Sequence, residues 1–171
     1  MTDTSSWRAL RTRGGLRNLG ATAAAVVASA GLGAAATDPG SGWYADLEKP
    51  PWNPPGAAFP LVWTPLYADI AVTGAAALTR LAHEGRRDEA AALRRALATN
   101  LVLNTGWSVV FWRVRRPWPA AAWCALLTAH SALLARRVGN VDPVLGAALA
   151  PYPLWCGFAT ALNTSIARRN S

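Results

Sequence analysis

Five long apolar runs, separated by short clusters of charged and turn-forming residues, constrain this chain more than any other feature. The runs cover residues 19–37, 59–82, 96–112, 118–135 and 143–167. At about 1.5 Å of rise per residue, about 20 helical residues cross a hydrocarbon layer about 30 Å thick. The runs are rich in Ala and Leu without the alternation of a half-buried strand, and open sheet edges cannot face lipid. The sequence therefore predicts an all-α protein, a bundle of five transmembrane helices.

The composition agrees with a membrane environment and with a single domain. The chain has 171 residues, of which 52% are hydrophobic and 15% charged, whereas a soluble domain is about a quarter charged. The formal net charge of +8 lies mostly at the ends of the apolar runs. This distribution indicates membrane topology and not a nucleic-acid-binding surface. We expect a basic N-terminal tail over residues 1–18 and one membrane domain over residues 19–171.

The distribution of basic residues predicts the orientation in the membrane. The tail, residues 80–95 and the Arg136-Arg137 pair carry eleven Lys and Arg residues, and the other connections and the C-terminus carry six. The positive-inside rule then places the N-terminus in the cytoplasm and the loop between the first two helices outside. An alternative remains for the first run, because small residues near Ala30 and Ala36 resemble a signal-peptide cleavage site, which would leave four spans.

A loop rich in proline and aromatic residues joins the first two runs. Proline fixes φ and removes a backbone donor, so residues 50–60 are expected to form a rigid, extended loop rather than a helix or a central strand. Flat side chains with few rotamers suit either a lid over a flat apolar ligand or a belt at the membrane interface. The aromatic residues of this stretch are Trp43, Tyr44, Trp52, Phe59 and Trp63.

Three ordered motifs carry a resemblance to a known family. They are WYADLEKPPWNPP followed by FPLVWTPLY in residues 43–67, LVLNTGW in residues 101–107, and PYPLWCGFATALN in residues 151–163. Together they resemble the tryptophan-rich sensory protein / translocator protein (TspO/MBR) family. The resemblance implies a five-helix bundle, usually dimeric, that binds porphyrins and in some members sterols, in a pocket capped by the first loop.

The resemblance also implies a set of ligand-binding residues. These match the family's loop tyrosine, the tryptophan ahead of the LY pair, the N-x-x-W pair, and the tryptophan and small residue of the last motif: Tyr44, Trp63, Asn104, Trp107, Trp155 and Ala159. Trp63 and Trp155 occupy positions implicated in porphyrin breakdown by bacterial relatives, and would be catalytic only if this chain is an enzyme. The alternative for tryptophans is interfacial anchoring, which we expect for Trp7, Trp118 and Trp123.

Several positions depart from the family pattern. Ala57 stands where relatives commonly carry an aromatic residue, which predicts a looser loop. Thr164 and Ala167 replace the aromatic residues of sterol-binding animal members, and no cholesterol motif surrounds Tyr152. Sterol is therefore not an expected ligand.

The expected function is a tetrapyrrole-binding sensor, with protoporphyrin IX or haem as ligand and no obligatory cofactor. Light- and oxygen-dependent porphyrin degradation and transport are the alternatives; no motif for hydrolysis or phosphoryl transfer is present, and no internal repeat suggests a transporter. Cys124 and Cys156 lack metal-ligand spacing and are expected to be small buried residues. Asp69 is either a functional intramembrane carboxylate or a solvated interfacial one. His130 is expected to be a buried hydrogen-bonded side chain rather than a haem ligand.

A homodimer is also expected. Gly106, Val110 and Phe111 resemble the interface motif of the family, and a glycine lets two helices approach closely. The alternative is that this face packs inside the chain.

Overall fold

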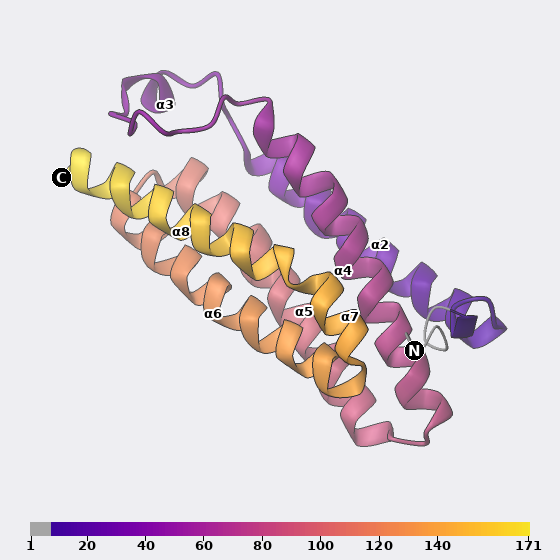
Figure 1. The fold of residues 1–171 in the computed structure, drawn as a ribbon. Coiled ribbons are helices and arrows are strands. Elements are labelled where there is room, and N and C mark those ends of the chain that lie inside the picture. The colour runs from indigo at the N-terminus through magenta and orange to yellow at the C-terminus, as the bar shows by residue number, and fades with distance from the viewer. Residues whose placement is uncertain (1–7) are drawn as a thin grey trace.

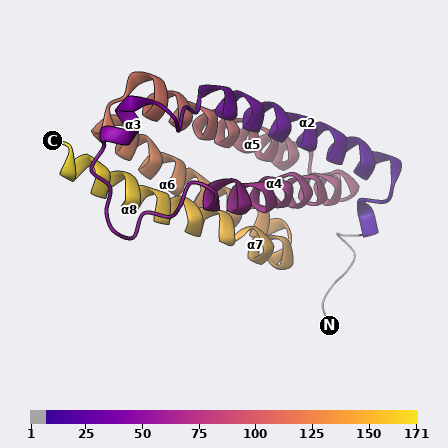
Figure 2. The same ribbon diagram turned by 90° about the horizontal axis from the view of Figure 1, so that it is seen from above.

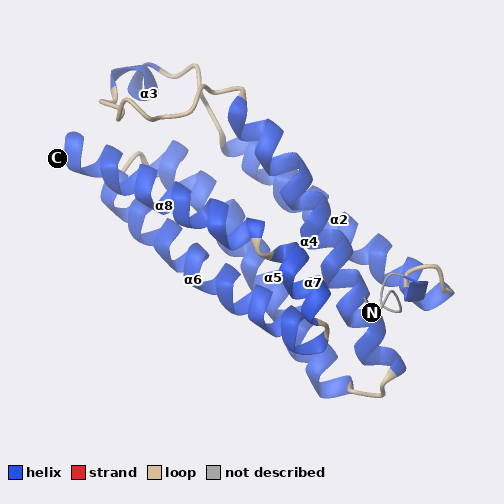
Figure 3. Cartoon of the chain, in the orientation of Figure 1, coloured by secondary structure: helices blue, strands red, loops and turns tan. Residues whose placement is uncertain are grey.

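The computed structural model describes residues 8–171, and all regular elements in that range are helical (Figures 1 and 3). The prediction of an all-α fold is therefore confirmed. In chain order the elements are α2 (Arg13–Ala36), α3 (Gly42–Asp46), α4 (Ala58–His83), α5 (Arg87–Val109), the π-helical turn η1 (Val110–Val114), α6 (Pro117–Val141), α7 (Pro143–Leu149) and α8 (Pro151–Arg169).

Apart from Thr37 and Ala150, the residues of the predicted apolar runs lie in helix, and several helices extend beyond the runs. Helix α2 begins at Arg13, so the last residues of the predicted tail form its first turns, and the Thr12 hydroxyl accepts a hydrogen bond from the Gly15 amide at 3.0 Å. Helix α5 begins at Arg87, ahead of the run that starts at residue 96. Helices continue past the hydrocarbon because charged side chains are solvated at the interface, so an apolar run marks only the part inside the membrane.

Four stretches of residues 8–171 are long and apolar enough to cross a membrane: α2, α4, α6 and the α7–α8 stretch from Pro143 to Arg169. The protein is therefore an integral, multi-pass membrane protein. Helix α5 has 23 residues but does not reach the same apolarity, because Arg87, Asp88, Glu89, Arg94 and Arg95 lie in its first half.

The helices pack side by side into one elongated bundle (Figures 1 and 2). Helix α2 packs on α4 and α5, and α6 packs on α5 and α8, whereas α4 and α8 meet only sparsely. The core contains fully buried side chains from α4, α5, α6, α7 and α8, among them Ile70, Leu81, Leu134, Leu149 and Tyr152. The N-terminal end of α2 and the C-terminus lie at opposite ends of the bundle (Figure 1).

Small residues and polar side chains hold the helices together. A Cβ atom on Gly146 of α7 would lie 2.5 Å from the Gly139 Cα atom of α6, so these backbones approach as only glycine allows. The Ser29 and Thr105 hydroxyls lie 2.8 Å apart between α2 and α5. Arg80 of α4 forms a salt bridge of 2.9 Å with the buried Asp142 at the start of α7.

The proline-rich loop is non-helical between Leu47 and Ala57, as the prolines predict. A short helix lies ahead of the prolines, and one feature differs from the prediction. The short helix α3 precedes the prolines, where the Ser41 hydroxyl accepts from the Tyr44 amide at 3.4 Å. Helix α4 begins at Ala58, so Pro60 lies in its first turn, where a missing backbone donor costs nothing.

Candidate functional site

The loop is fastened over the ends of η1 and α8. Leu47 is buried against Phe111, Trp112 and the α8 residues Leu162 and Ile166. The backbone of Glu48 exchanges two hydrogen bonds of 3.0 Å with the side chain of Asn170. These contacts join residues 122 positions apart in the chain and fix the loop at one end of the bundle.

The single lysine of the loop folds it back on itself. The Lys49 ammonium donates to the carbonyl oxygens of Tyr44 and, at 3.1 Å, Leu47, and lies 4.3 Å from the centroid of the Tyr44 ring. A cation over a tyrosine face adds about 0.5–1 kcal/mol at a partly exposed position. Burial raises the pKa of the Tyr44 hydroxyl above its usual value, and a hydrogen bond with Asn53 opposes this.

Five aromatic residues form the contact between the loop and η1, and we call them the loop-anchor cluster: Trp43, Tyr44, Trp107, Phe111 and Trp112. The Trp43 and Phe111 rings meet edge to face at 5.3 Å, and the Tyr44 and Trp112 rings lie 4.8 Å apart. Trp107 stacks on Phe111 at 5.4 Å. The turn η1 places two consecutive buried rings, Phe111 and Trp112, next to each other, and Arg115 (φ 57°) follows its last residue. The loop therefore meets a continuous aromatic surface.

A second aromatic group lies where α4 faces α8, and we call it the site cluster: Phe59, Trp63, Tyr67, Tyr152, Trp155 and Phe158. The Trp63 ring contacts Tyr67 at 5.2 Å and Tyr152 at 6.2 Å. Trp155 stacks on Phe158 at 5.1 Å and meets Phe59 edge to face at 6.2 Å. The loop residue Trp52 covers Phe158 at 5.9 Å. Rings from α4, α8 and the loop therefore meet in one place.

A chain of polar side chains runs from the site cluster into the bundle core. The Tyr67 hydroxyl donates to Asn104 Oδ1 at 2.8 Å, and Asn104 Nδ2 donates to the Tyr152 hydroxyl at 3.3 Å. The Tyr152 hydroxyl in turn donates to Asn100 Oδ1 at 2.7 Å, and Asn100 Nδ2 donates to the Ser131 hydroxyl at 3.0 Å. A buried amide without partners would cost about 1–3 kcal/mol, so this chain fixes α4, α5, α6 and α8 relative to one another.

One polar atom of the site cluster stands apart from this chain. Within residues 8–171, Trp155 Nε1 is the only buried side-chain nitrogen or oxygen atom without a hydrogen bond. The indole lies between Phe59 and Phe158, which offer no acceptor. A buried donor left unsatisfied costs about 1–3 kcal/mol, so the position is unfavourable for the protein alone and favourable once an acceptor enters.

The predicted ligand-binding residues divide between the two clusters. Trp63 and Trp155 lie in the site cluster, and Asn104 contacts it through Tyr67 and Tyr152. Tyr44 and Trp107 lie in the loop-anchor cluster. Trp107 Nε1 donates to Asn163 Oδ1 at 3.2 Å, and Asn163 Nδ2 donates to the Ala159 carbonyl at 2.8 Å, so the indole N–H of Trp107 is already occupied.

Besides Ser131 at its end, the polar chain contains three residues that were not predicted as part of the site: Tyr67, Tyr152 and Asn100. Helical spacing contains the signal that would have found them. Tyr67 follows Trp63 by four residues, Tyr152 precedes Trp155 by three, and Asn100 precedes Asn104 by four, so each shares a helix face with a predicted residue.

Aromatic side chains pack against one another beneath the loop. Two cavities, of about 460 and 180 Å³, lie between α2, α4 and α5. A pocket capped by the loop stays a prediction.

Two of the three residues predicted for a dimer interface pack inside the chain. A Cβ atom on Gly106 would lie 2.5 Å from the Trp123 ring of α6, so this glycine makes room for an indole of its own chain. Phe111 is buried in the loop-anchor cluster, and Val110 is half-buried beside it. Gly106 and Phe111 thus have contacts within the chain, and an interface at these residues stays a prediction. The dimer itself stays a prediction. Replacing Gly106 by a bulky residue cannot test it, because the new side chain would displace Trp123 of the same chain.

The remaining polar and sulfur-containing candidates have modest roles in the structure. Cys124 and Cys156 are free and buried, as predicted. His130 Nδ1 lies 3.3 Å from Asn100 Nδ2, at the end of the polar chain. Asp69 is half-exposed on α4 and forms no salt bridge within residues 8–171. The same described range contains no group of three His, Cys, Asp or Glu side chains able to hold a metal ion.

Trp123 belongs to the packing of the bundle, since its Nε1 donates to the Leu103 carbonyl at 2.8 Å and its ring covers Gly106. This differs from the interfacial role predicted for it. Trp118 is half-exposed near the C-terminus, with Nε1 donating to the Ser171 hydroxyl at 3.0 Å. Trp7 lies outside the described residues.

Comparison with known proteins places these features in a family context. The family model described as "TspO/MBR family" matches residues 21–169. The tryptophan-rich protein TspO of Chlorobaculum tepidum is 33% identical over 132 residues, which cover 77% of this chain and 82% of the relative. The tryptophan-rich sensory protein of Cereibacter sphaeroides is 34% identical, covering 75% and 77%. The human translocator protein is 31% identical, covering 75% of each chain.

Proposed function

The chain belongs to the TspO/MBR family, and on this basis we propose that it binds a tetrapyrrole, protoporphyrin IX or haem, and reports its level. The observation that carries the proposal is the buried, unpartnered indole N–H of Trp155 within the site cluster. A tetrapyrrole is flat and apolar and bears carboxylate oxygens, so it would match both the surrounding rings and the free donor.

The ligand would lie between α4 and α8, beneath Trp52 and Phe59. Two observations support this location. Helices α4 and α8 meet only sparsely, so side chains rather than backbones fill the space between them. The polar chain from Tyr67 to Ser131 fixes the helices around this location relative to one another. Only the aromatic rings next to the loop would then need to move when a ligand binds.

We also propose that α5 is the fifth crossing and that the N-terminus is cytoplasmic. Helix α5 lies inside the bundle between α2 and α6, and the basic residues favour this orientation. Reporter fusions at both ends would test the arrangement: reporters active on the same side of the membrane would contradict it.

The binding proposal can be tested by titrating the purified protein in detergent with protoporphyrin IX, haem and a sterol. Replacing Trp155 by Phe keeps a ring but removes the free donor, and we expect affinity for protoporphyrin to fall about tenfold, as the loss of one hydrogen bond of about 1.4 kcal/mol implies. Trp118→Phe is the matched control, because its indole lies at the surface, and it should bind as wild type does. Undiminished affinity in a folded Trp63→Ala, Trp155→Ala variant would show that the site lies elsewhere.

Degradation of the ligand is a second candidate function, favoured by the presence of the oxidisable rings of Trp63, Tyr67 and Trp155 in the same cluster. A bound porphyrin supplies its own photochemistry and requires from the protein position and electron-rich neighbours. Illumination of the complex in air separates the two functions. A binder leaves the porphyrin spectrum unchanged, whereas an enzyme yields a new absorbing product that Trp63→Phe and Trp155→Phe variants, still able to bind, do not form.

A further inference from the structure

A cavity at the end of the bundle opposite the loop has the character of an anion site. It has a volume of about 460 Å³ and lies where the first turns of α2 meet the last turns of α4 and the first half of α5. Three arginines and a histidine line it: Arg13 and Arg17 from α2, His83 from α4, and Arg94 from α5. No carboxylate is among the residues that line it within the described range 8–171.

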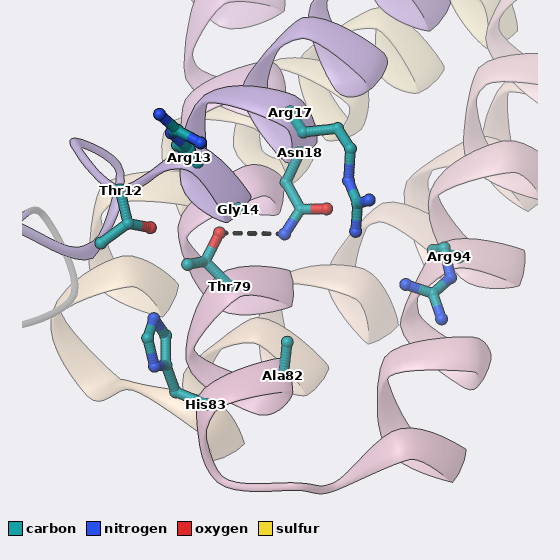
Figure 4. A pocket seen from close by; sticks show the side chains of 9 residues that line it. All are labelled: Thr12, Arg13, Gly14, Arg17, Asn18, Thr79, Ala82, His83 and Arg94. Atoms are coloured by element: carbon teal, nitrogen blue, oxygen red, sulfur yellow. Dashed lines mark hydrogen bonds between the residues drawn. The ribbon is translucent and has the colours of Figure 1, made fainter.

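The polar floor of this cavity is fixed. Asn18 Nδ2 of α2 donates to the Thr79 hydroxyl of α4 at 3.0 Å, and Figure 4 shows this bond in the middle of the cavity. In that view Arg17 and Arg94 lie on one side of the bond, and Thr12 and His83 lie on the other. Cationic groups from α2 and α5, together with the His83 ring of α4, therefore lie around one small space.

These arginines differ from their neighbours in how their charge is compensated. Arg80 pairs with Glu84 and Asp142, and Arg86 pairs with Glu84 and Glu89. Within residues 8–171, Arg13, Arg17 and Arg94 form no salt bridge. Glu84, Glu89 and Asp142 are thus already engaged with Arg80 and Arg86, and Asp88 is not among the residues that line the cavity. Within residues 8–171, no salt bridge compensates the charge of the three cavity arginines.

An apolar groove continues from this cavity toward the middle of the bundle. The groove has a volume of about 180 Å³, and Asn18 and Arg94 line both spaces. Its walls are apolar side chains of α2, α4 and α5, including Ala25, Val26, Ile70, Leu97 and Leu101. From Asn18 to Val26 the groove follows α2 for about 12 Å, since a helix rises about 1.5 Å per residue.

We propose that this composite site binds one anionic phospholipid, with its phosphate among Arg13, Arg17 and Arg94 and one acyl chain in the groove. The basic cavity matches a phosphodiester, and basic pockets between transmembrane helices recognise such headgroups. The groove explains why a lipid fits better than a free anion, which would leave the apolar walls uncovered. A zwitterionic lipid fits less well because the described lining residues offer no carboxylate to pair with its cationic group. The inference is independent of tetrapyrrole binding, which involves the other end of the bundle.

The test measures lipid binding to the purified protein by native mass spectrometry, with phosphatidylglycerol, phosphatidylcholine and inorganic phosphate as probes. We expect a 1:1 complex with phosphatidylglycerol, at least tenfold weaker binding of phosphatidylcholine, and weak binding of phosphate. The double variant Arg17→Gln, Arg94→Gln should bind phosphatidylglycerol at least tenfold more weakly. The matched control Arg11→Gln, Arg95→Gln removes the same charge from exposed positions outside the cavity and should retain wild-type affinity.

A second variant tests the groove. Ala25→Leu fills it without changing charge, and should weaken phosphatidylglycerol binding several-fold while leaving phosphate binding unchanged. The proposal is overturned if phosphate binds as tightly as phosphatidylglycerol, if the control double variant loses as much affinity as the cavity variant, or if all variants bind as wild type does. The midpoint of thermal unfolding in detergent serves as the folding check for each variant.

Discussion

The loop-anchor cluster and the site cluster are built from the same residue types but differ in whether their polar atoms are satisfied. In the loop-anchor cluster, Trp107 donates its indole N–H to Asn163. In the site cluster, Trp155 is equally enclosed by rings, but residues 8–171 supply no acceptor for its N–H. The first arrangement is complete within the chain and serves stability, whereas the second leaves a donor that a ligand can use.

The polar chain beside the site cluster sharpens this difference, because its members, unlike Trp155, all have partners. We expect the largest effect on stability from Asn104→Leu, which keeps the number and branching of side-chain heavy atoms but leaves the Tyr67 hydroxyl without its acceptor and removes a donor to Tyr152. The loss should be about 2 kcal/mol, seen as a lower midpoint of thermal unfolding in detergent. Asn140→Leu on the exposed face of α6 is the control and should leave the midpoint within error. Equal midpoints for the two variants would mean that the chain contributes nothing to stability.

A direct comparison of the two tryptophans should give an intermediate effect. Trp107→Phe removes a satisfied donor and leaves the Asn163 side-chain oxygen without it, whereas Trp155→Phe removes a donor that was unsatisfied. Both changes delete the same volume, so we expect Trp107→Phe to be less stable than Trp155→Phe by about 1 kcal/mol. Thermal unfolding of the ligand-free proteins measures the difference. If Trp155→Phe proved the less stable of the two, the N–H of Trp155 would have a structural partner and the distinction between the clusters would be lost.

The smallest expected effect concerns the pH dependence of loop attachment. Burial raises the pKa of Tyr44, so the folded protein favours the neutral phenol. A raised folded-state pKa contributes stability that is fully present below the unfolded value, about pH 10, and is lost as the pH rises through the folded value. We therefore expect stability to fall slightly more steeply above about pH 10 in wild type than in Tyr44→Phe, measured by unfolding midpoints on both sides of that pH. Identical pH profiles for the two proteins would show that Tyr44 does not contribute to the pH dependence of stability.

The long helices, the proline-rich loop and the family follow from the amino-acid sequence alone. Runs such as 118–135 are long and apolar enough to require helix in a membrane, and the prolines between Pro50 and Pro55 interrupt it in any context. Helix ends were less well determined: the charged turns before residue 96 belong to α5, because helix formation does not stop where apolarity does. The three motifs, by their residues and their order along the chain, were specific enough to indicate the family.

What each residue of the motifs contacts depends on how the helices pack against one another. Trp107 and Trp155 look equivalent in sequence, and their difference depends on Asn163, which lies 56 residues from Trp107. Gly106 suggests a partner helix by its type, but Trp123 of the same chain fills the space. In the sequence, Arg17 and Arg94 are ordinary charged residues near the end of an apolar run. In the structure, α2 and α5 place both beside the same cavity. The periodicity of a sequence shows which face of a helix is apolar. Which side chains form hydrogen bonds or ion pairs between helices depends on the distances between those helices, and no single segment specifies them.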